Sequence, residues 1–233
     1  MSSQELWVCR LGVVEYRETL ALQERLRTAR HAERIPDTLL LLEHWPVYTR
    51  GRRSTAGELP LGEAWCLDRG IDVVDTDRGG RLTYHGPGQL VGYPIMRIDD
   101  VIAYLRTIEI ALVLALADAG IGARARADEG PDFTGVWTED RKIASIGVHV
   151  SRAITTHGFA VNVHNDLQPF QWVVPCGLDG VSMTSVLKES GGSGELLAGF
   201  REIVAERFAE AFGRRPRRID IEDLEACVAQ PAT

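Results

Sequence analysis

The chain has few cysteines, and no two of them are close together. Cys9, Cys66, Cys176 and Cys227 form no C-x-x-C pair. Zinc sites and disulfide frameworks need closely patterned cysteines, so this spacing disfavours both and fits a reducing compartment. We therefore expect a cytoplasmic protein without a metal site.

Long apolar runs and an excess of positive charge are also lacking. No apolar run approaches the roughly 18 residues of a membrane span. Residues 1–16 have no basic region followed by an uninterrupted apolar stretch, so no signal peptide is predicted. The formal net charge is -7, whereas a general nucleic-acid binder would be basic. We expect no nucleic-acid partner and no membrane partner.

Lysine is the scarcest charged residue. Only Lys142 and Lys188 are lysines among 26 basic residues, and the rest are arginines. Unlike arginine, lysine can lose its proton under working conditions, so a retained lysine can indicate a chemical role. Chance survival explains Lys188, which lies in the polar stretch "KESGGSGE". Lys142 comes directly before the apolar run "IASIGVHV" and is the better candidate for a chemical role.

The rest of the chain is ordinary globular material, with 45% hydrophobic residues over 233 positions. Pro36 and Gly213 end two of the predicted helices, and Asp99 and Asp100 begin a third that stops at Gly120. The predicted helices span 16–35, 101–119 and 196–212. The predicted strands span 6–16, 37–48, 70–77 and 89–98, with consecutive antiparallel strands over 136–166 and one short strand and helix after 213.

These strands and helices are mixed without strict alternation. That order predicts an α+β fold with a mostly antiparallel sheet. The chain shows no internal repeat, and the glycine-rich stretch 188–195 is the best candidate boundary. The residues after this boundary are interpreted as a small C-terminal addition to one main domain.

The stretch "RGGRLTYHGPGQLVGYPI", residues 78–95, contains five glycines and two prolines. It matches neither the dinucleotide fingerprint nor the phosphate-binding P-loop. Two readings remain open on this pattern alone. The glycines mark either structural turns or loops in which the backbone approaches a ligand closely. Under the second reading, His85 is the histidine that we assign to a site.

Cys176 and Lys142 are the candidate reactive side chains. Pro175 and Gly177 flank the cysteine and predict a bend from which its side chain projects. Strict alternation from Lys142 places it on one face with Ala144 and Ile146. Two readings stay open: a strand-end lysine in solvent, or a lysine beside an apolar pocket whose ammonium favours a nearby thiolate.

Three segments together resemble the lipoyl(octanoyl) transferase family. They are "RGGRLTYHGPGQLVGYPI", "RKIASIGVHVSRAITTHGFAVNV" and "PCGLDGVSMTSV", and the resemblance runs from about residue 10 to about residue 210. It implies the α+β fold of biotin and lipoate protein ligase catalytic domains, a mixed sheet with flanking helices. The octanoyltransferase catalytic domain is predicted over 1–213, with 214–233 as a tail.

The resemblance also implies the site residues. Cys176 matches the acyl-accepting cysteine and Lys142 the active-site lysine. Backbone N–H groups of either the "SIG" or the "GFA" segment would stabilise an oxyanion. The residues matched to the acyl pocket are Arg78, Gly79, Gly80, Arg81, Leu82, Thr83, Tyr84, His85, Ser145, Ile146, Gly147, Gly158, Phe159 and Ala160.

The implied reaction moves an octanoyl group through a cysteine thioester and needs no cofactor. The implied donor is octanoyl-acyl carrier protein. The implied acceptors are apo lipoyl domains of 2-oxoacid dehydrogenase E2 subunits and the glycine cleavage H protein. Arginines 50, 52 and 53 are interpreted as a cluster that steers these acidic partners. For arginines 214, 215, 217 and 218 two interpretations stay open, a second steering cluster or solvated side chains with no partner. An ATP-dependent ligase and a non-catalytic acyl-binding protein are the alternatives.

Overall fold

The computed structural model describes residues 4–173, 181–192 and 196–229. The helices are α1 (Tyr16–His31), α2 (Gly62–Leu67), α3 (Val101–Asp118), α4 (Val186–Ser190), α5 (Leu196–Ala211) and α6 (Ile221–Ala229). The strands are β1 (Glu5–Val14), β2 (Asp37–His44), β3 (Val47–Arg50), β4 (Asp72–Asp75), β5 (Thr83–His85), β6 (Gln89–Ile95), β7 (Arg124–Ala125), β8 (Gly135–Thr138), β9 (Arg141–Ser151), β10 (Ile154–Asn162), β11 (Ser182–Met183) and β12 (Arg215–Ile219).

The main sheet is mixed and mostly antiparallel, as predicted. Its strand order is β12-β1-β2-β6-β10-β9-β8-β7, and β11 pairs with β9. The pairs of β1 with β12 and β2, and of β9 with β11, are parallel, and the others are antiparallel. A second, small sheet has the order β4-β3-β5.

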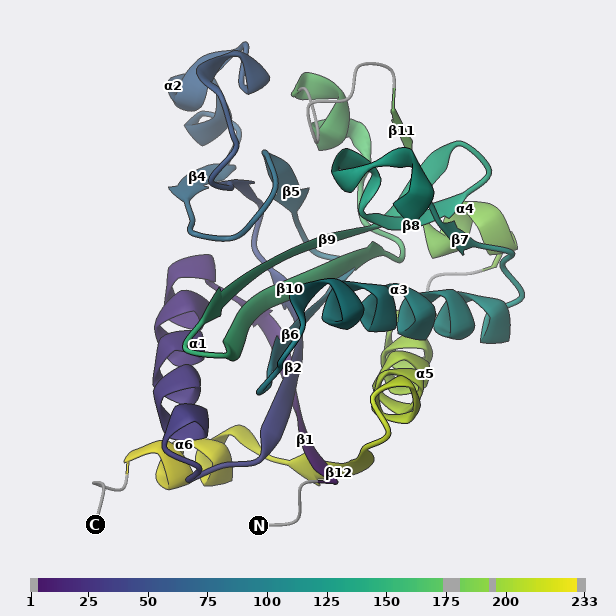
Figure 1. Ribbon diagram of the computed structural model, residues 1–233. Coiled ribbons are helices and arrows are strands. Elements are labelled where there is room, and N and C mark those ends of the chain that lie inside the picture. Colours follow the sequence, from purple (N-terminus) through teal and green to yellow (C-terminus); the bar gives the residue numbers. More distant parts are fainter. Residues whose placement is uncertain (1–3, 174–180, 193–195, 230–233) are drawn as a thin grey trace.

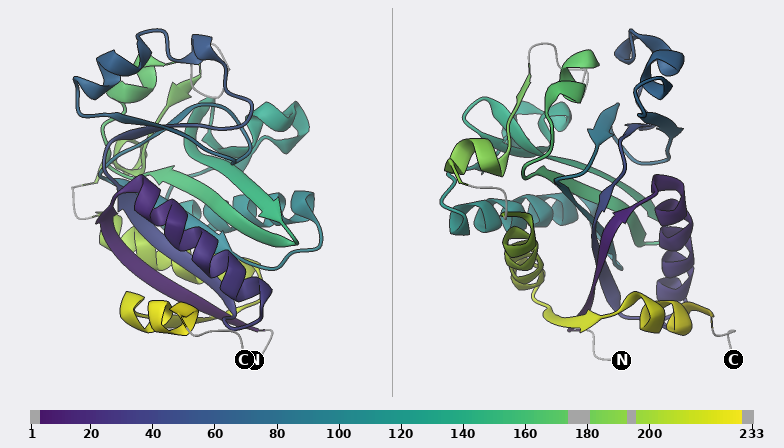
Figure 2. Two further views of the ribbon diagram at one scale, coloured as in Figure 1. Left: turned by 90° about the vertical axis from the view of Figure 1, so that its left-hand side faces the viewer. Right: turned by 180° about the vertical axis from the view of Figure 1, so that it is seen from behind.

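Helices cover both faces of the main sheet, which gives three layers (Figures 1 and 2). One apolar cluster joins the sheet to α3 and α5, and a second joins it to α1 and α6. A third apolar cluster packs around the small sheet. This sheet lies above β9 and β10 in Figure 1. Within the described ranges, every helix is too short or too polar to cross a bilayer.

Two of the differences from the predicted boundaries have a clear physical cause. The first helix ends at His31 rather than at residue 35, and Glu33 has a left-handed φ of 59°. Proline disfavours helical backbone in the residue before it, and Ile35 lies outside the helix, in the core, with 1% exposure.

The predicted strand 37–48 is two strands, β2 and β3, that belong to different sheets. Pro46 lies at the break between them and has no N–H group with which to continue a ladder. The change of sheet here positions the small sheet over β9 and β10.

The third helix confirms its predicted signals. The Asp100 side chain accepts hydrogen bonds from the backbone N–H groups of Ile102 (2.7 Å) and Ala103 (3.0 Å). Gly120 follows the helix with φ of 76°, a conformation that favours glycine. The antiparallel strands around residues 139 and 152 and the C-terminal strand and helix are also confirmed. The division of the chain at residue 213 stays a prediction.

Gly158 is the position at which a methyl group should damage the fold most directly. A Cβ there would lie 2.1 Å from the Gly92 carbonyl oxygen and 2.5 Å from Pro94 Cδ, so backbone would have to move. Gly158→Ala should lower the free energy of unfolding by about 1–3 kcal/mol, as overpacking does. Gly199, inside α5, has no atom within 4 Å of an added Cβ.

Gly199→Ala is therefore the matched control for Gly158→Ala. It should raise the free energy of unfolding by about 0.5–1 kcal/mol, since alanine is the better helix former. Urea unfolding of both variants checks the pair. Equal effects of the two substitutions would contradict the close packing of β10 on β6.

Candidate active site

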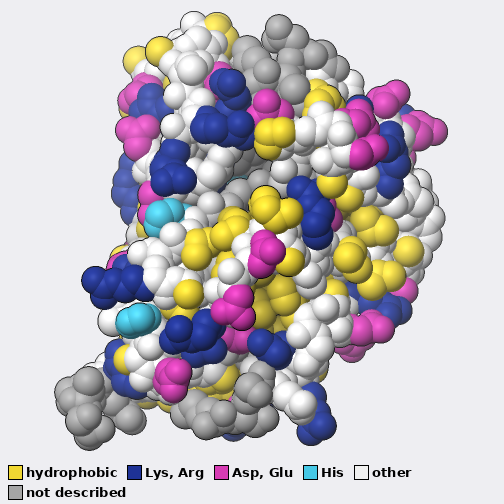
Figure 3. Space-filling model, in the orientation of Figure 1, with side chains coloured by type: hydrophobic (Ala, Val, Ile, Leu, Met, Phe, Trp, Pro, Cys, Tyr) yellow, Lys and Arg dark blue, Asp and Glu magenta, His cyan; other side chains and the backbone are white. Residues whose placement is uncertain are grey.

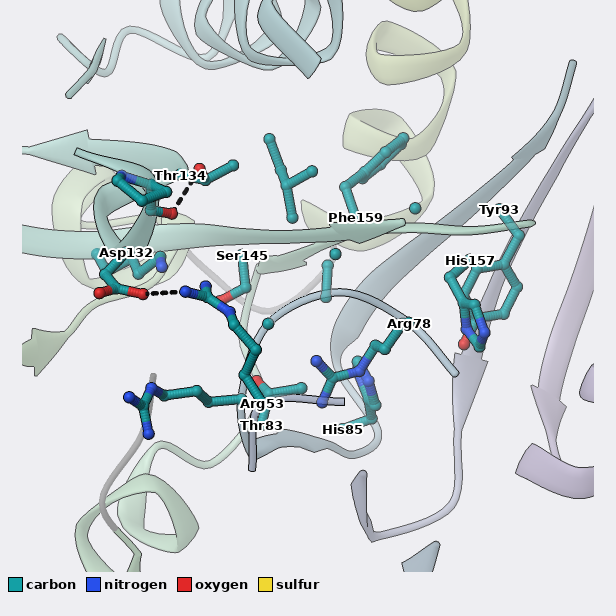
Figure 4. A pocket seen from close by; sticks show the side chains of 18 of the residues that line it. Arg53, Arg78, Thr83, His85, Tyr93, Asp132, Thr134, Ser145, His157 and Phe159 are labelled. Atoms are coloured by element: carbon teal, nitrogen blue, oxygen red, sulfur yellow. Dashed lines mark hydrogen bonds and ion pairs between the residues drawn. The ribbon is translucent and has the colours of Figure 1, made fainter. Parts of the chain in front are cut away.

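A pocket opens between the loop that precedes β5 and the strands β9 and β10. It encloses about 630 Å³ of empty space, a volume that includes the open solvent at its mouth. Figure 4 shows Thr134 and Asp132 at one end of the pocket and Tyr93 and His157 at the other.

Most residues that the resemblance assigns to the pocket line its wall. These are Arg78, Gly80, Arg81, Thr83, His85, Lys142, Ser145, Ile146, Gly147, Gly158, Phe159 and Ala160. Leu82 and Tyr84 instead join the small-sheet core. Successive side chains of a strand point to opposite faces, so Thr83 and His85 face the pocket while Tyr84 faces away. Gly79 also lies outside the wall.

Cys176 lies outside the described residues, so its assignment stays a prediction. Its segment is followed by β11, in which Met183 pairs with Lys142 and Ser182 with Arg141. The backbone N–H of Thr184 also donates to the Lys142 carbonyl, at 3.0 Å. The strand that follows the cysteine segment in the sequence is thus hydrogen-bonded to the backbone of the candidate lysine.

Sequence reasoning missed several residues of the wall. These are Tyr16, Arg53, Tyr93, Pro131, Asp132, Thr134 and His157. They come from separate stretches of the chain, and only the fold brings them together. Arg53 forms an ion pair with Asp132 (2.8 Å) at the pocket mouth, where it was expected only to steer partners. His157 also lines the wall, whereas His85 was the one histidine assigned to a site from the sequence.

Strict alternation along β9 is wrong at Lys142. The ladder between β8 and β9 shifts register, because Val136 pairs with Ala144 while Trp137 pairs with Lys142. Ile143 is thus an extra residue, and both Ile143 and Ala144 pack into the core toward α3 and α5. A β-bulge re-aims the side chains beside it. It turns Lys142 to the face of Ser145, which lines the pocket.

The Lys142 side chain is buried, with 2% exposure. The structure therefore rules out the reading of a strand-end lysine in solvent. Its Nζ lies 5.2 Å from the centre of the Trp137 ring, within the range of a cation–π contact. Gly135, with φ of 139°, leaves room for the lysine, since a Cβ there would lie 2.7 Å from Lys142 Cε.

The glycine-rich loop is held by contacts with backbone. The guanidinium of Arg78 donates to the Thr49 carbonyl (2.6 Å) and to Thr49 Oγ1 (2.8 Å). A Cβ on Gly51 would lie 2.5 Å from the Gly80 carbonyl oxygen, and Gly80 has φ of 89°. Both readings of the glycines therefore hold in part: they permit tight packing of two loops, and Gly80 also lines the pocket.

Buried aromatic and histidine side chains close the far end of the pocket. His44 Nε2 and the Tyr93 hydroxyl share a hydrogen bond of 2.7 Å, and His85 Nδ1 and Gln89 Oε1 share another of 2.7 Å. The ring of Tyr16 stacks on His85. Burial lowers the pKa of His44 to about 4 and that of His85 well below its usual range. Both histidines are therefore neutral at pH 7.

His157 borders this end on β10 and has a left-handed backbone, with φ of 56°. Its Nε2 lies 2.7 Å from Asp77 Oδ1, one residue before the Arg78 loop. The hydrogen bond from His157 lowers the pKa of Asp77 to about 2, so the carboxylate is ionised and bound to the ring at neutral pH. This contact ties the glycine-rich loop to the pocket floor.

The buried histidines predict a stability that falls in mild acid. The pKa of an unfolded-state histidine is about 6.5. Between this pH and a lower folded-state pKa, the folded protein binds fewer protons at the histidine than the unfolded protein does. The stability that the protein has above about pH 6.5 is therefore lost as the pH falls toward the folded-state pKa. For His44 the loss should reach about 3 kcal/mol near pH 4. Urea unfolding between pH 7.5 and 4 measures it. His44→Gln should flatten the curve, and an unchanged pH dependence would contradict this role of His44.

The remaining cysteines are poor candidates for a nucleophile at this pocket. Cys9 lies in the core beneath α1, and burial raises its pKa to about 11. Burial also raises the pKa of Cys66, which packs in the small-sheet core. Cys227 is half-buried on α6. Among the described residues, no group of three His, Cys, Asp or Glu side chains could hold a metal ion.

Many arginines of the two clusters considered for docking are engaged within the chain. Arg50 pairs with Glu63 and Asp75, both at 2.6 Å. Arg214 pairs with the buried Asp37 at 3.0 Å and therefore serves the fold. On the face drawn in Figure 3, basic and acidic side chains are interspersed. Partner steering stays a prediction.

Known proteins share the fold. The solved structure of a lipoate-protein ligase A bound with ATP matches with a TM-score of 0.76 at 20% identity, covering 97% of this chain and 93% of that one. A bipartite lipoate protein ligase from Thermoplasma acidophilum matches with a TM-score of 0.72 at 19% identity, covering 97% and 91%. At these identities the likeness shows the fold alone.

Sequence comparison identifies the family. The lipoyl protein ligase A/B catalytic domain matches residues 15–213. An octanoyltransferase of Caldicellulosiruptor saccharolyticus is 41% identical, over 96% of both chains. Octanoyltransferases of Acidothermus cellulolyticus and Geobacter sulfurreducens are 45% and 48% identical, over 85% and 78% of this chain and 88% and 74% of their own. The chain therefore belongs to the octanoyltransferase family, the acyltransferases of protein lipoylation.

Proposed function

We propose that this protein transfers an octanoyl group from octanoyl-acyl carrier protein to a lysine of apo lipoyl domains, through a thioester on Cys176. The observation that carries the proposal is the buried Lys142 in the pocket wall, with the strand that follows the cysteine segment paired to it. The names of the relatives give the acyl group.

In the first step, the Cys176 thiolate attacks the thioester carbonyl of the donor. The bond between the carbonyl carbon and the carrier sulfur breaks, and the carrier leaves as a thiol after taking up one proton. A free cysteine, with a pKa of about 8.5, is only a few per cent thiolate at neutral pH. The Lys142 ammonium would favour the thiolate and then give its proton to the leaving sulfur.

In the second step, the acceptor lysine attacks the acyl-enzyme as a neutral amine. A C–N bond forms, the C–S bond to Cys176 breaks, and the amine loses one proton to neutral Lys142. The lysine thereby returns to its ammonium form beside the regenerated thiolate. The thioester supplies the driving force, so no nucleotide or redox group enters either step.

The pocket suits a medium-length acyl chain. Its walls near β9 and β10 are backbone and small side chains, including Gly147, Gly158 and Ala160. We infer that the carbonyl lies at the Lys142 end, with the hydrocarbon running toward Tyr93. Backbone segments 145–147 and 158–160 lie along this path and are the candidate oxyanion donors.

The acceptor class rests on related proteins. The solved structure of the Thermoplasma acidophilum ligase is described together with its E2 lipoyl domain. The shared fold and the family's part in protein lipoylation make lipoyl domains, including those of 2-oxoacid dehydrogenase E2 subunits and the glycine cleavage H protein, the acceptors to test first.

A ligase is the competing function, because the structural relatives include an enzyme that binds ATP. The chain lacks a phosphate-binding P-loop, and the candidate cysteine has no role in ligase chemistry. Octanoyl carrier protein with an apo lipoyl domain should give octanoylated domain in a chelated, nucleotide-free buffer. Free octanoate with ATP and magnesium should give none. A faster reaction from free octanoate and ATP would replace the transferase by the ligase.

A further inference from the structure

Glu109 is a buried carboxylate that neither transfer step uses. It lies on α3 with 1% exposure. Its Oε1 accepts a hydrogen bond from the backbone N–H of Gly135 (3.0 Å), and its Oε2 pairs with Arg106. Burial raises the pKa of this carboxyl, and the Gly135 amide, Arg106 and Lys142 oppose that rise.

Gly135 connects this carboxylate to the candidate lysine. An added Cβ on Gly135 would lie 2.7 Å from Lys142 Cε and 3.4 Å from its Nζ, so the lysine side chain lies against this residue. The same residue donates its amide to Glu109. Gly135 has a φ of 139°, and its N–H group is bonded to Glu109 on α3. The Lys142 side chain lies against the same residue and lines the pocket.

We propose that Glu109 is a positioning residue for Lys142: it holds Gly135 in place against the lysine side chain and supplies buried negative charge near its ammonium. The inference rests on the proposed function only in giving Lys142 a part in transfer. A buried ammonium requires compensating charge and fixed contacts. Glu109 supplies negative charge from α3, and it holds Gly135, the residue that lies against the lysine side chain.

Arg106 modulates this charge without cancelling it. Its side chain is 31% exposed, whereas that of Glu109 is 1% exposed, so water screens the cation more than the anion. The other charged groups in this neighbourhood form ion pairs of their own. These pairs are Arg126 with Glu129, Asp132 with Arg53, and Arg141 with both Glu139 and Glu189. Arg126 also lies over the Trp137 ring, which Lys142 contacts as well.

The scarcity of lysine makes the inference directly measurable. Protein grown with ¹³C-labelled lysine carries only two labelled side chains, Lys142 and Lys188. Lys188→Arg leaves one Cε signal and so assigns both. The midpoint of the Lys142 Cε titration is then read by NMR as a function of pH, without any substrate.

Glu109→Gln should move the Lys142 midpoint to lower pH, because a nearby negative charge is lost. Arg106→Gln should move it to higher pH, because a nearby positive charge is lost. Asp37→Asn is the matched control, since Asp37 is also buried, binds arginines and accepts from the backbone N–H of Arg97. It should leave the midpoint unchanged.

Opposite shifts in the two α3 variants support the inference, and a purely structural role for Glu109 would not produce them. If Glu109→Gln does not fold, an upward shift in Arg106→Gln supports the inference and an unchanged or lower midpoint overturns it. Unmoved midpoints in both variants also overturn it. These outcomes need no turnover, so a failure of the transferase proposal would be seen separately, in the activity of Lys142→Arg.

Discussion

Replacing Cys176 by serine should abolish octanoyl transfer while the fold remains intact. A hydroxyl is far less acidic than a thiol, so one neighbouring ammonium cannot ionise it. Transfer to an apo lipoyl domain should fall by at least about 10⁴-fold, on the scale seen when the nucleophile of another acyl-transfer enzyme is removed. Gel-shift or mass analysis of the acceptor domain measures the rate.

Cys227→Ser is the matched control, because Cys227 is half-buried on α6 and does not line the pocket. It should transfer at the wild-type rate, and urea unfolding should show that both variants fold. Normal transfer by Cys176→Ser would remove the cysteine from the mechanism and favour direct attack of the acceptor amine on the carrier thioester.

Replacing Lys142 by arginine should also impair transfer severely, although the positive charge is kept. Arginine does not give up its proton at working pH, so it can favour the thiolate but cannot shuttle protons. The loss should be about 10²–10⁴-fold, the usual contribution of general acid–base catalysis. The planar guanidinium must also fit against Gly135 and Trp137, where the lysine stem lies.

Two measurements separate these effects. Iodoacetamide labelling of Cys176 should remain fast in Lys142→Arg if the cation still favours the thiolate, while transfer fails. Lys188→Arg makes the same substitution at the other lysine and should leave both rates unchanged. Near-normal turnover by Lys142→Arg would show that the lysine acts only as a fixed positive charge.

The sequence predicted those parts of the fold that depend on local signals. Helix α3 begins after Asp100 and ends before Gly120, as expected. A helix cap and a glycine with a left-handed backbone conformation each depend on only a few neighbouring residues. The face occupied by Lys142 could not be predicted, since the bulge at Ile143 exists only relative to the partner strand β8. A periodic pattern carries no record of such an inserted residue.

The composition of the site shows the same division. Thr83 and His85 lie in one short motif and were predicted together, and alternation explains why Tyr84 between them points away. Tyr16, Tyr93 and His157 were missed, because each comes from a different element and only the packing of α1, β6 and β10 brings them to one pocket end. No spacing in the sequence relates them.

The most direct test of the central claim is the covalent intermediate itself. The wild-type protein is incubated with octanoyl carrier protein, without an acceptor, and examined by intact-protein mass spectrometry and peptide mapping. We predict one octanoyl group per chain, on Cys176, that is released when an apo lipoyl domain is added. An adduct on Cys9, Cys66 or Cys227, or transfer to the domain with no adduct on the enzyme at any time, would contradict the proposed mechanism.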